Sequence, residues 1–514
     1  MKNKSEKLAN PPRPFGAPLP RRGIGKHIFK VGGWTAVSRV FGFIRDMLIA
    51  NVLGAGRLSD IFIAASKLPN LFRDLLGEGA FSSVFVPMFC ETRDSNCEAP
   101  DAATQFAKNA YSWLMAILLG ITILALIFMP LIIWILAPGF SDDPSKMQLT
   151  VLISRITIFY LIFICGSAFL SSVLNAFSEF SLVASMSVLM NVFMIGGLLL
   201  ARHHSQKALY IMSFALVLSG IVQMWILAGR LRQRKFGLRL IRPRWTPKIK
   251  TMFRRFGVTI LSSGFYQINI ILGALVASFQ SGAISWLYYS DRIVQLPFAI
   301  IGLSAGTVLL TSISEALAKK NLRGVYIQQN SALRSSLMLT LPAVAGLFVL
   351  AEPIIKILFQ HGAWEPASTK AVAIAIMIMS FALPAMTTSQ IYSKTLYAAQ
   401  DVRTPVKVSV IALITSSLIY IAAFPFIGYL AVPIGTVIAG YLRNFLFWRA
   451  CHRRKLFKME PKTIRATIGF GVLSAALGAG LWFVPVHNVF VLAAALAAFG
   501  IIYLPIAFLI NKKI

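Results

Sequence analysis

The stretch SRVFGFIRD, residues 38–46, places two arginines inside the first long apolar run of a very apolar chain. An arginine near the centre of a membrane-spanning helix costs about 2.5–3.5 kcal/mol on insertion scales. Such a residue therefore faces a partner or a water-filled cavity instead of lipid. The stretch predicts a bundle of membrane helices arranged around a charged interior.

The composition supports a membrane protein. Of the 514 residues, 57% are hydrophobic, and Asp and Glu together number only 18. Apolar runs of about 20 residues, long enough to cross a bilayer as helices, follow one another with short polar gaps. We therefore predict an all-α polytopic membrane protein with about fourteen transmembrane helices. The expected spans are 31–53, 58–89, 110–137, 149–175, 180–200, 208–229, 254–279, 285–315, 328–350, 371–398, 406–425, 428–448, 464–485 and 488–510.

The net charge of +32 comes from Lys and Arg clusters between the apolar runs. In a soluble protein this charge would suggest nucleic-acid binding, but clusters at alternate helix ends indicate topology, because cytoplasmic loops carry excess Lys and Arg. The basic segments are the N-terminal tail, 229–250, 318–323 and 449–458, whereas 138–146, 280–283 and 484–488 carry few or no cations. We expect both termini in the cytosol, contacts with membrane lipids and no nucleic-acid partner.

A weak internal repeat divides the chain. A shift of 228 residues places GAGRLSDIFIAASKLPN (54–70) over SGAISWLYYSDRIVQLP (281–297). Repeats with interrupted helices at corresponding positions are typical of transporters whose substrate site lies between the repeats. The predicted organisation is a cytosolic basic tail (1–30), a six-helix bundle (31–229), a basic cytosolic linker (230–253), a pseudo-symmetric second six-helix bundle (254–448) and a two-helix appendage (449–514).

The candidate site residues are arginines away from the span ends, namely Arg39, Arg45, Arg73 and Arg292. Arginine stays protonated and presents a planar fork to phosphate oxygens, so arginines from both halves around one cavity predict a site for a polyanion. Arg39 and Arg45 are separated by about 9 Å along a helix and about 120° around it, so they would flank an elongated anion. Gly42 lies between these two arginines and is a candidate hinge or kink of this helix. Pro69 and Pro297 are expected to kink their helices.

A structural alternative is that these arginines pair with carboxylates on other helices or extend to water at helix ends. The sequence neighbours Arg45–Asp46, Arg73–Asp74 and Asp291–Arg292 point about 100° apart on a helix. We therefore expect no pairing within each couple.

An enzyme is not expected. The six histidines lie in loops or termini, and the sequence has no GxxxxGK[ST] motif, no HExxH motif and no paired-acid motif. We predict no catalytic residues, no metal site and no cofactor.

At these residues the sequence resembles the MviN/MurJ family, the lipid II flippases of the multidrug/oligosaccharidyl-lipid/polysaccharide exporter superfamily. The resemblance extends over residues 31 to about 510. It is carried by SRVFGFIRDMLIANVLGAG (38–56), SDIFIAASKLPNLFRDLLGEGAFSSVFVPMF (59–89), SWLYYSDRIVQLP (285–297) and QDVRTPVK (400–407).

The resemblance implies export of lipid II, which is undecaprenyl-pyrophosphoryl-MurNAc-pentapeptide-GlcNAc, across the bacterial inner membrane by alternating access. Family members use cavity arginines matching the four candidates, with Ser38, Asp60 and Ser285 at matching polar positions. The resemblance further implies that 464–485 and 488–510 form a groove for the lipid tail. Docking of peptidoglycan synthases as partners is left open.

Two positions depart from some relatives, because Gln295 replaces a glutamate and Asp74 replaces an arginine. The first weakens an ion-coupling role at that position, and the second lowers the positive charge of the cavity.

The alternative functions are an exporter of another prenyl-linked saccharide, a drug/cation antiporter of the same superfamily, a membrane-bound polymerase or ligase, and a structural scaffold. The first would bind another prenyl-linked ligand, and an antiporter would have an acid-rich cavity. A polymerase or ligase would need large outer loops with catalytic residues. A scaffold would need no buried charge.

Overall fold

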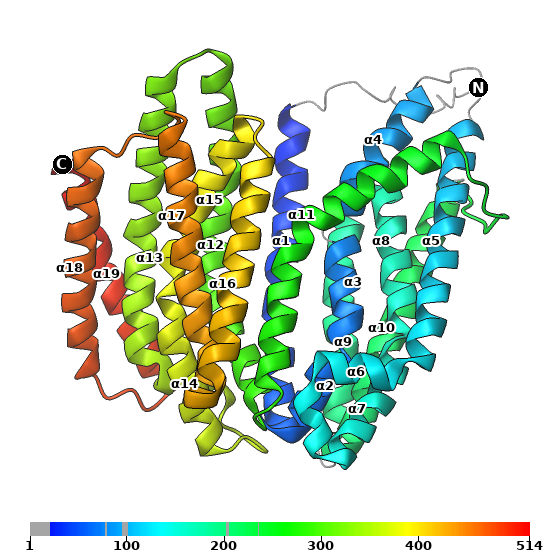
Figure 1. The fold of residues 1–514 in the computed structure, drawn as a ribbon, viewed down its shortest axis with the longest axis horizontal. Coiled ribbons are helices and arrows are strands. Elements are labelled where there is room, and N and C mark those ends of the chain that lie inside the picture. Colours follow the sequence, from blue (N-terminus) through cyan, green and yellow to red (C-terminus); the bar gives the residue numbers. More distant parts are fainter. Residues whose placement is uncertain (1–20, 78–79, 95–100, 202–204, 235, 514) are drawn as a thin grey trace, which may run out of the picture.

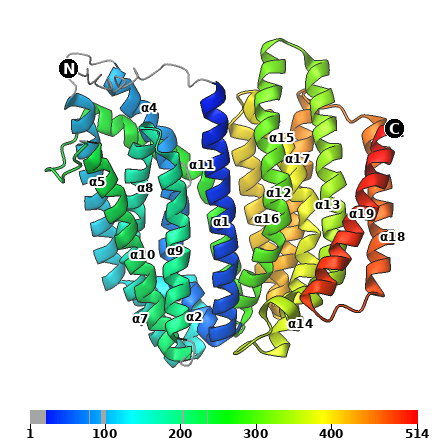
Figure 2. The same ribbon diagram turned by 180° about the vertical axis from the view of Figure 1, so that it is seen from behind.

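The computed structural model describes residues 21–77, 80–94, 101–201, 205–234 and 236–513, and in these segments the chain is helical with no β-strand. Figures 1 and 2 show two helical bundles standing side by side, with a helix pair on the outside of the second. We call the end of the molecule that holds Arg21 and Lys513 the terminal end. The opposite end is called the distal end.

The first bundle follows the predicted spans. Its helices are α1 (Arg21–Leu53), α2 (Arg57–Ala65), α3 (Lys67–Gly77), α4 (Ala80–Asp94), α5 (Asp101–Ile127), α6 (Met129–Leu136), α7 (Pro144–Thr157), α8 (Tyr160–Ala176), α9 (Phe180–Ala201) and α10 (Ser205–Gln233), with a short 3-10 helix, η1 (Pro138–Asp142). The predicted span 58–89 is divided into α2, α3 and α4. Pro69 lies in the first turn of α3, where its missing N–H and its ring disfavour an uninterrupted helix across Ala65.

The second bundle and the final pair also match the expected spans. They consist of α11 (Pro247–Ala277), α12 (Ala283–Ala318), α13 (Leu322–Phe359), α14 (Pro366–Ser380), α15 (Ala382–Ala398), α16 (Arg403–Ile427), η2 (Gly428–Leu430), α17 (Ala431–Arg453), α18 (Pro461–Trp482) and α19 (Val489–Lys513). Pro297 lies inside α12, which continues through it. Nine helical stretches in the described segments are long and apolar enough to cross a membrane, and the remaining predicted spans also fall on helices, consistent with about fourteen crossings.

The start of α11 lies across the first bundle before the helix reaches the second (Figure 1). Phe256 of α11 packs edge-on against Phe81 of α4, with 5.6 Å between ring centroids. Phe85 and Phe169 extend this buried aromatic cluster into α4 and α8. The helix therefore links the two bundles by hydrophobic packing.

The two bundles are joined closely at the distal end. The Ala363 amide donates a 2.8 Å hydrogen bond to the Asn51 carbonyl, and the Gly139 amide donates a 2.9 Å hydrogen bond to Ser278 Oγ. Gly54 adopts a φ of +69°, and a Cβ there would lie 2.4 Å from the Ala363 carbonyl oxygen. A side chain at this turn would separate the bundles, so the close approach requires glycine.

Candidate functional site

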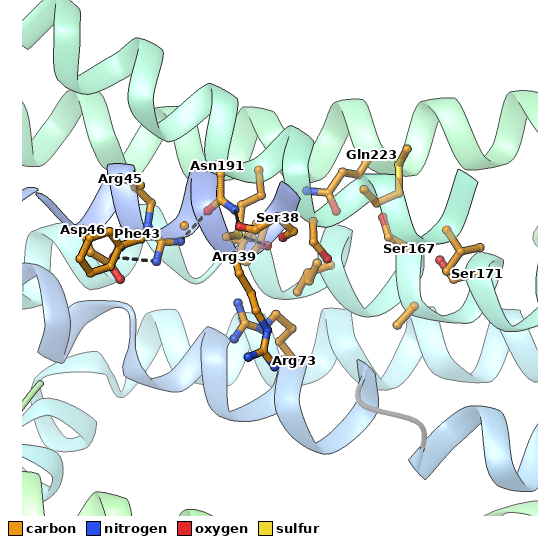
Figure 3. A pocket seen from close by; sticks show the side chains of 18 of the residues that line it. Ser38, Arg39, Phe43, Arg45, Asp46, Arg73, Ser167, Ser171, Asn191 and Gln223 are labelled. Carbon is orange, nitrogen blue, oxygen red and sulfur yellow. Dashed lines mark hydrogen bonds and ion pairs between the residues drawn. The ribbon is translucent and has the colours of Figure 1, made fainter. Parts of the chain in front are cut away.

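A cavity of about 580 Å³ lies between the bundles, and we call it the arginine cavity (Figure 3). It is lined by α1, α3, α4, α8, α9 and α10 of the first bundle and by α12 of the second. The sequence-predicted residues that line it are Ser38, Arg39, Gly42, Arg45, Arg73 and Arg292. The four arginines thus come together from both halves of the chain, as expected for a site between repeats.

Arg45 is held firmly in the wall of the cavity. Its side chain is 13% exposed, and its Nη1 donates a 3.0 Å hydrogen bond to Asn191 Oδ1 on α9. Asn191 in turn donates to the Ser38 carbonyl at 3.1 Å. A Cβ at position 42 would lie 3.6 Å from Asn191 Nδ2, which is an ordinary van der Waals contact. The packing of α1 on α9 therefore does not require glycine here, and the predicted role of Gly42 as a hinge stays a prediction.

The expectation that neighbouring charges do not pair is wrong for two couples. Arg45 donates to Asp46 Oδ1 from Nε at 3.1 Å and from Nη2 at 2.7 Å. Arg73 donates to Asp74 Oδ1 from Nε at 3.2 Å and from Nη2 at 2.9 Å. The 100° separation applies to the Cβ directions, whereas the long arginine side chain bends back around the helix to reach its neighbour.

Asp46 also connects the two bundles. Its Oδ2 lies 3.4 Å from Nε of Arg292 on α12, and its Oδ1 accepts a 3.2 Å hydrogen bond from the Tyr288 hydroxyl. Arg292 donates to the same hydroxyl at 3.1 Å and lies over the Tyr288 ring. The Asp46 side chain is only 5% exposed, so this carboxylate is a buried counter-ion shared by two arginines.

Arg39 and Arg73 extend toward each other from opposite walls of the cavity (Figure 3). Arg39 makes no ion pair or hydrogen bond through its side chain with the residues that the structure describes, and it is exposed. Arg73 is half-buried beside Asp74, which also accepts a 3.4 Å hydrogen bond from Gln267. Among the described residues that line the cavity, Asp46 is the one carboxylate and faces four arginines, so the cavity keeps a net positive charge.

Gln295 forms a hydrogen bond with Asp291 one turn earlier on α12. Both line a second, smaller cavity of about 180 Å³ that Lys67 reaches from α3. The residue that departs from some relatives is therefore engaged with a carboxylate of its own helix.

Asp60 and Ser285 do not line the arginine cavity and instead lie fully buried at the distal end. Asp60 Oδ1 accepts hydrogen bonds from the Ser285 amide at 2.9 Å and the Ser285 hydroxyl at 2.8 Å. Its Oδ2 accepts from the Gly282 amide at 2.8 Å and from Lys146 Nζ at 3.0 Å. A carboxylate at the N-terminus of α12 is further stabilised by the helix dipole. Pro69 and Pro297 are likewise absent from the residues that line the arginine cavity.

The sequence patterns do not predict site roles for Asn191, Tyr288 or Lys146, nor the bridging position of Asp46. Asn191 carried a usable signal, because it is a lone amide within the apolar stretch VLMNVFMIGG (188–197). The sequence has no such signal at Tyr288 or Lys146, because their roles depend on contacts with α1 and α2 across the fold.

Comparison with known proteins places the chain in a family. The family model described as "Lipid II flippase MurJ" matches residues 49–501. The chain belongs to the MurJ lipid II flippase family. A protein of Rhizobium tropici named as a probable lipid II flippase MurJ is 33% identical over 457 residues, which cover 88% of this chain and 85% of the relative. The lipid II flippase MurJ of Burkholderia cenocepacia is 27% identical over 504 residues, covering 95% and 97%.

Solved structures agree on the fold of the MurJ family. A lipid II flippase MurJ in an inward closed conformation superposes with a TM-score of 0.80 at 23% identity, covering 94% of this chain and 99% of the other. An inward-facing multidrug resistance transporter of the MATE family superposes with a TM-score of 0.67 at 14% identity, covering 81% and 94%. These likenesses support the two-bundle fold.

Proposed function

We propose that the protein moves lipid II from the inner to the outer leaflet of a bacterial cytoplasmic membrane by alternating access. The observation that carries this proposal is the arginine cavity, where three arginines of the first bundle and Arg292 of the second surround one space. Membership of the MurJ family supplies the substrate class. The peptidoglycan precursor would then be delivered for cell-wall synthesis outside.

The chemistry of the cavity suits a lipid-linked diphosphate. A bare diphosphate cannot cross hydrocarbon, because burying an unpaired charge is very unfavourable. Arginines replace its hydration shell with charge-assisted, bidentate hydrogen bonds, while the prenyl chain stays in lipid. The distal contacts between Asp60, Ser285 and Lys146 would close the outer side while the headgroup enters from the inner leaflet.

The membrane potential is our proposed source of energy. With the positive side outside, the potential favours outward movement of an anion by about 2.3 kcal/mol per charge per 100 mV. This proposal places both termini in the cytosol, in keeping with the basic segments 229–250, 318–323 and 449–458. Lipid transport by this route needs no covalent chemistry from the protein.

An exporter of cationic drugs is a weaker candidate, because a cation would meet the net positive charge of the cavity. An exporter of another prenyl-linked saccharide would differ from a lipid II exporter only in the sugar that it binds.

Binding should therefore be measured with purified protein against lipid II, undecaprenyl phosphate, another prenyl-linked sugar and a cationic dye. We expect lipid II to bind most tightly and the dye not to bind. Equal affinity for all four ligands would contradict the proposal.

A further inference from the structure

Uncharged polar side chains form a second compartment of the arginine cavity. On α8, Ser167, Ser171 and Asn175 recur every four residues, so they lie on one face of the helix and extend over about 12 Å. Gln223 of α10 and Ser187 of α9 line the same space. We call these five residues the neutral wall. All five belong to the first bundle.

The hydrogen bonding of the neutral wall is incomplete. Hydroxyls elsewhere in these helices donate to a carbonyl one turn back, as Ser172 does to Ala168 at 2.9 Å and Ser213 to Leu209 at 2.7 Å. Ser167 is only 3% exposed, yet its Oγ has no hydrogen-bond partner in the described part of the chain. A buried hydroxyl without a partner is unfavourable, so a ligand in the cavity that forms a hydrogen bond with this atom would gain stability.

Gln223 repeats this pattern on another helix. The residue is 3% exposed, and its Nε2 has no hydrogen-bond partner in the segments that the structure describes. Figure 3 shows Ser167, Ser171 and Gln223 on the same side of the group formed by Arg39, Arg45 and Arg73. Two buried, unpartnered polar groups on α8 and α10 thus border one cavity.

The two compartments have different chemistry. Arg45 and Arg292 lie beside Asp46, further along α1 toward the distal end. The neutral wall supplies hydroxyl and amide groups, which donate and accept hydrogen bonds without charge. Such groups match the hydroxyl and N-acetyl groups of an amino sugar, whereas peptide carboxylates would favour cations.

We propose that the neutral wall is a saccharide subsite that binds the sugar attached to the diphosphate. This inference rests on the proposed function, because it takes the diphosphate to lie among the arginines. The sugar bonded directly to the diphosphate must then occupy the adjoining part of the cavity. Occupation would satisfy Ser167 and Gln223, and it would let the protein select a sugar-bearing lipid over the bare lipid diphosphate.

The test compares two ligands that differ in the headgroup. Full-length purified protein is titrated with lipid II and with undecaprenyl pyrophosphate, which has the same lipid and diphosphate but no sugar. The variant Ser167→Ala/Ser171→Ala/Asn175→Ala should bind lipid II about ten- to a hundred-fold more weakly, while its affinity for undecaprenyl pyrophosphate stays unchanged. The matched control is Ser213→Ala/Ser219→Ala, whose hydroxyls are bonded within α10 and do not line the cavity.

The outcomes separate this inference from the proposed function. If the wild-type protein binds both lipids equally, or the triple variant weakens both equally, the saccharide subsite is wrong and the diphosphate site stands. If the wild-type protein binds neither lipid, both the proposed function and the saccharide subsite are wrong. A peptide-free form of lipid II distinguishes sugar from peptide, because loss of the variant's effect with that ligand would overturn the saccharide assignment.

A labelling measurement provides a second test that does not depend on folding of the triple variant. Ser171→Cys, in a chain with Cys90→Ser and Cys97→Ser, is treated with a maleimide in the presence of each lipid. Lipid II should slow labelling at least about tenfold more than undecaprenyl pyrophosphate does. Equal protection by the two lipids would contradict a sugar contact at this position.

Discussion

Asp46 on α1 and Arg292 on α12 form a 3.4 Å ion pair that joins the two bundles across the arginine cavity. The same carboxylate holds Arg45 at 2.7 Å, so two arginines share one buried counter-ion. A diphosphate that binds these arginines must compete with Asp46 for their donors. Binding of such a ligand would therefore be coupled to the link between the bundles.

Replacing this counter-ion should strengthen anion binding. In Asp46→Asn, Arg45 and Arg292 lose their competing carboxylate, and we expect undecaprenyl pyrophosphate to bind about tenfold more tightly. Transport should become slower, because the ligand is released less readily. Titration of the purified variant and a vesicle flipping assay measure the two effects. Weaker binding by Asp46→Asn would show that the carboxylate positions the arginines instead of competing for them.

Single arginine substitutions should abolish function. Arg39→Ala, Arg73→Ala and Arg292→Ala each remove a positive charge from the arginine cavity, and we expect none of them to support growth as the only copy of the gene. Protein levels must be measured to exclude loss of expression. Arg239→Ala is the matched control, because Arg239 is an exposed residue of the basic linker. Growth of all three cavity variants would contradict the anion site.

The buried pair of Asp60 and Lys146 should control stability at the distal end. Asp60→Asn leaves Lys146, which is 4% exposed, without its counter-ion, and removal of one partner from a buried pair destabilises by about 3–5 kcal/mol. Thermal unfolding of the purified protein measures the change. The double variant Asp60→Asn/Lys146→Met should recover part of the stability. Equal melting temperatures for wild type and Asp60→Asn would show that the pair contributes little.

The pH dependence of stability should reflect Glu179, which lies in the turn between α8 and α9 outside the spans. Partial burial raises the pKa of Glu179, but hydrogen bonds from Arg234 and Arg230 outweigh burial and hold the pKa below its ordinary value. This stabilisation is present at neutral pH and is lost as the pH falls through the lowered pKa. Glu179→Gln should therefore unfold more easily at pH 7, by at most about 1 kcal/mol. A difference that persists unchanged at acid pH would contradict this assignment.

Dissipating the membrane potential should stop net outward transport. In vesicles with the positive side outside, lipid II should accumulate in the outer leaflet, and an ionophore that collapses the potential should abolish this accumulation. The readout is the accessibility of lipid II to an externally added binding protein. Unchanged accumulation without a potential would remove the proposed driving force.

The sequence alone determined the membrane class, the approximate spans and the four arginines of the cavity. These features are local, because hydropathy over about 20 residues defines a span and a charge within it must avoid lipid. The resemblance carried by residues 38–56, 59–89 and 285–297 also indicated the family that the comparisons confirmed. Pro69 lies just after the break between α2 and α3, whereas α12 continues through Pro297.

Only the tertiary structure decided which charges meet. It paired Arg45 with Asp46 against expectation, and it placed Asp60 and Ser285 in a buried contact away from the cavity. It also revealed Asn191 and Tyr288 as partners of the site. These contacts join residues more than 140 positions apart, or depend on how a long side chain bends. Helical periodicity gives the direction in which a side chain leaves its helix, but the packing of neighbouring helices decides what it reaches.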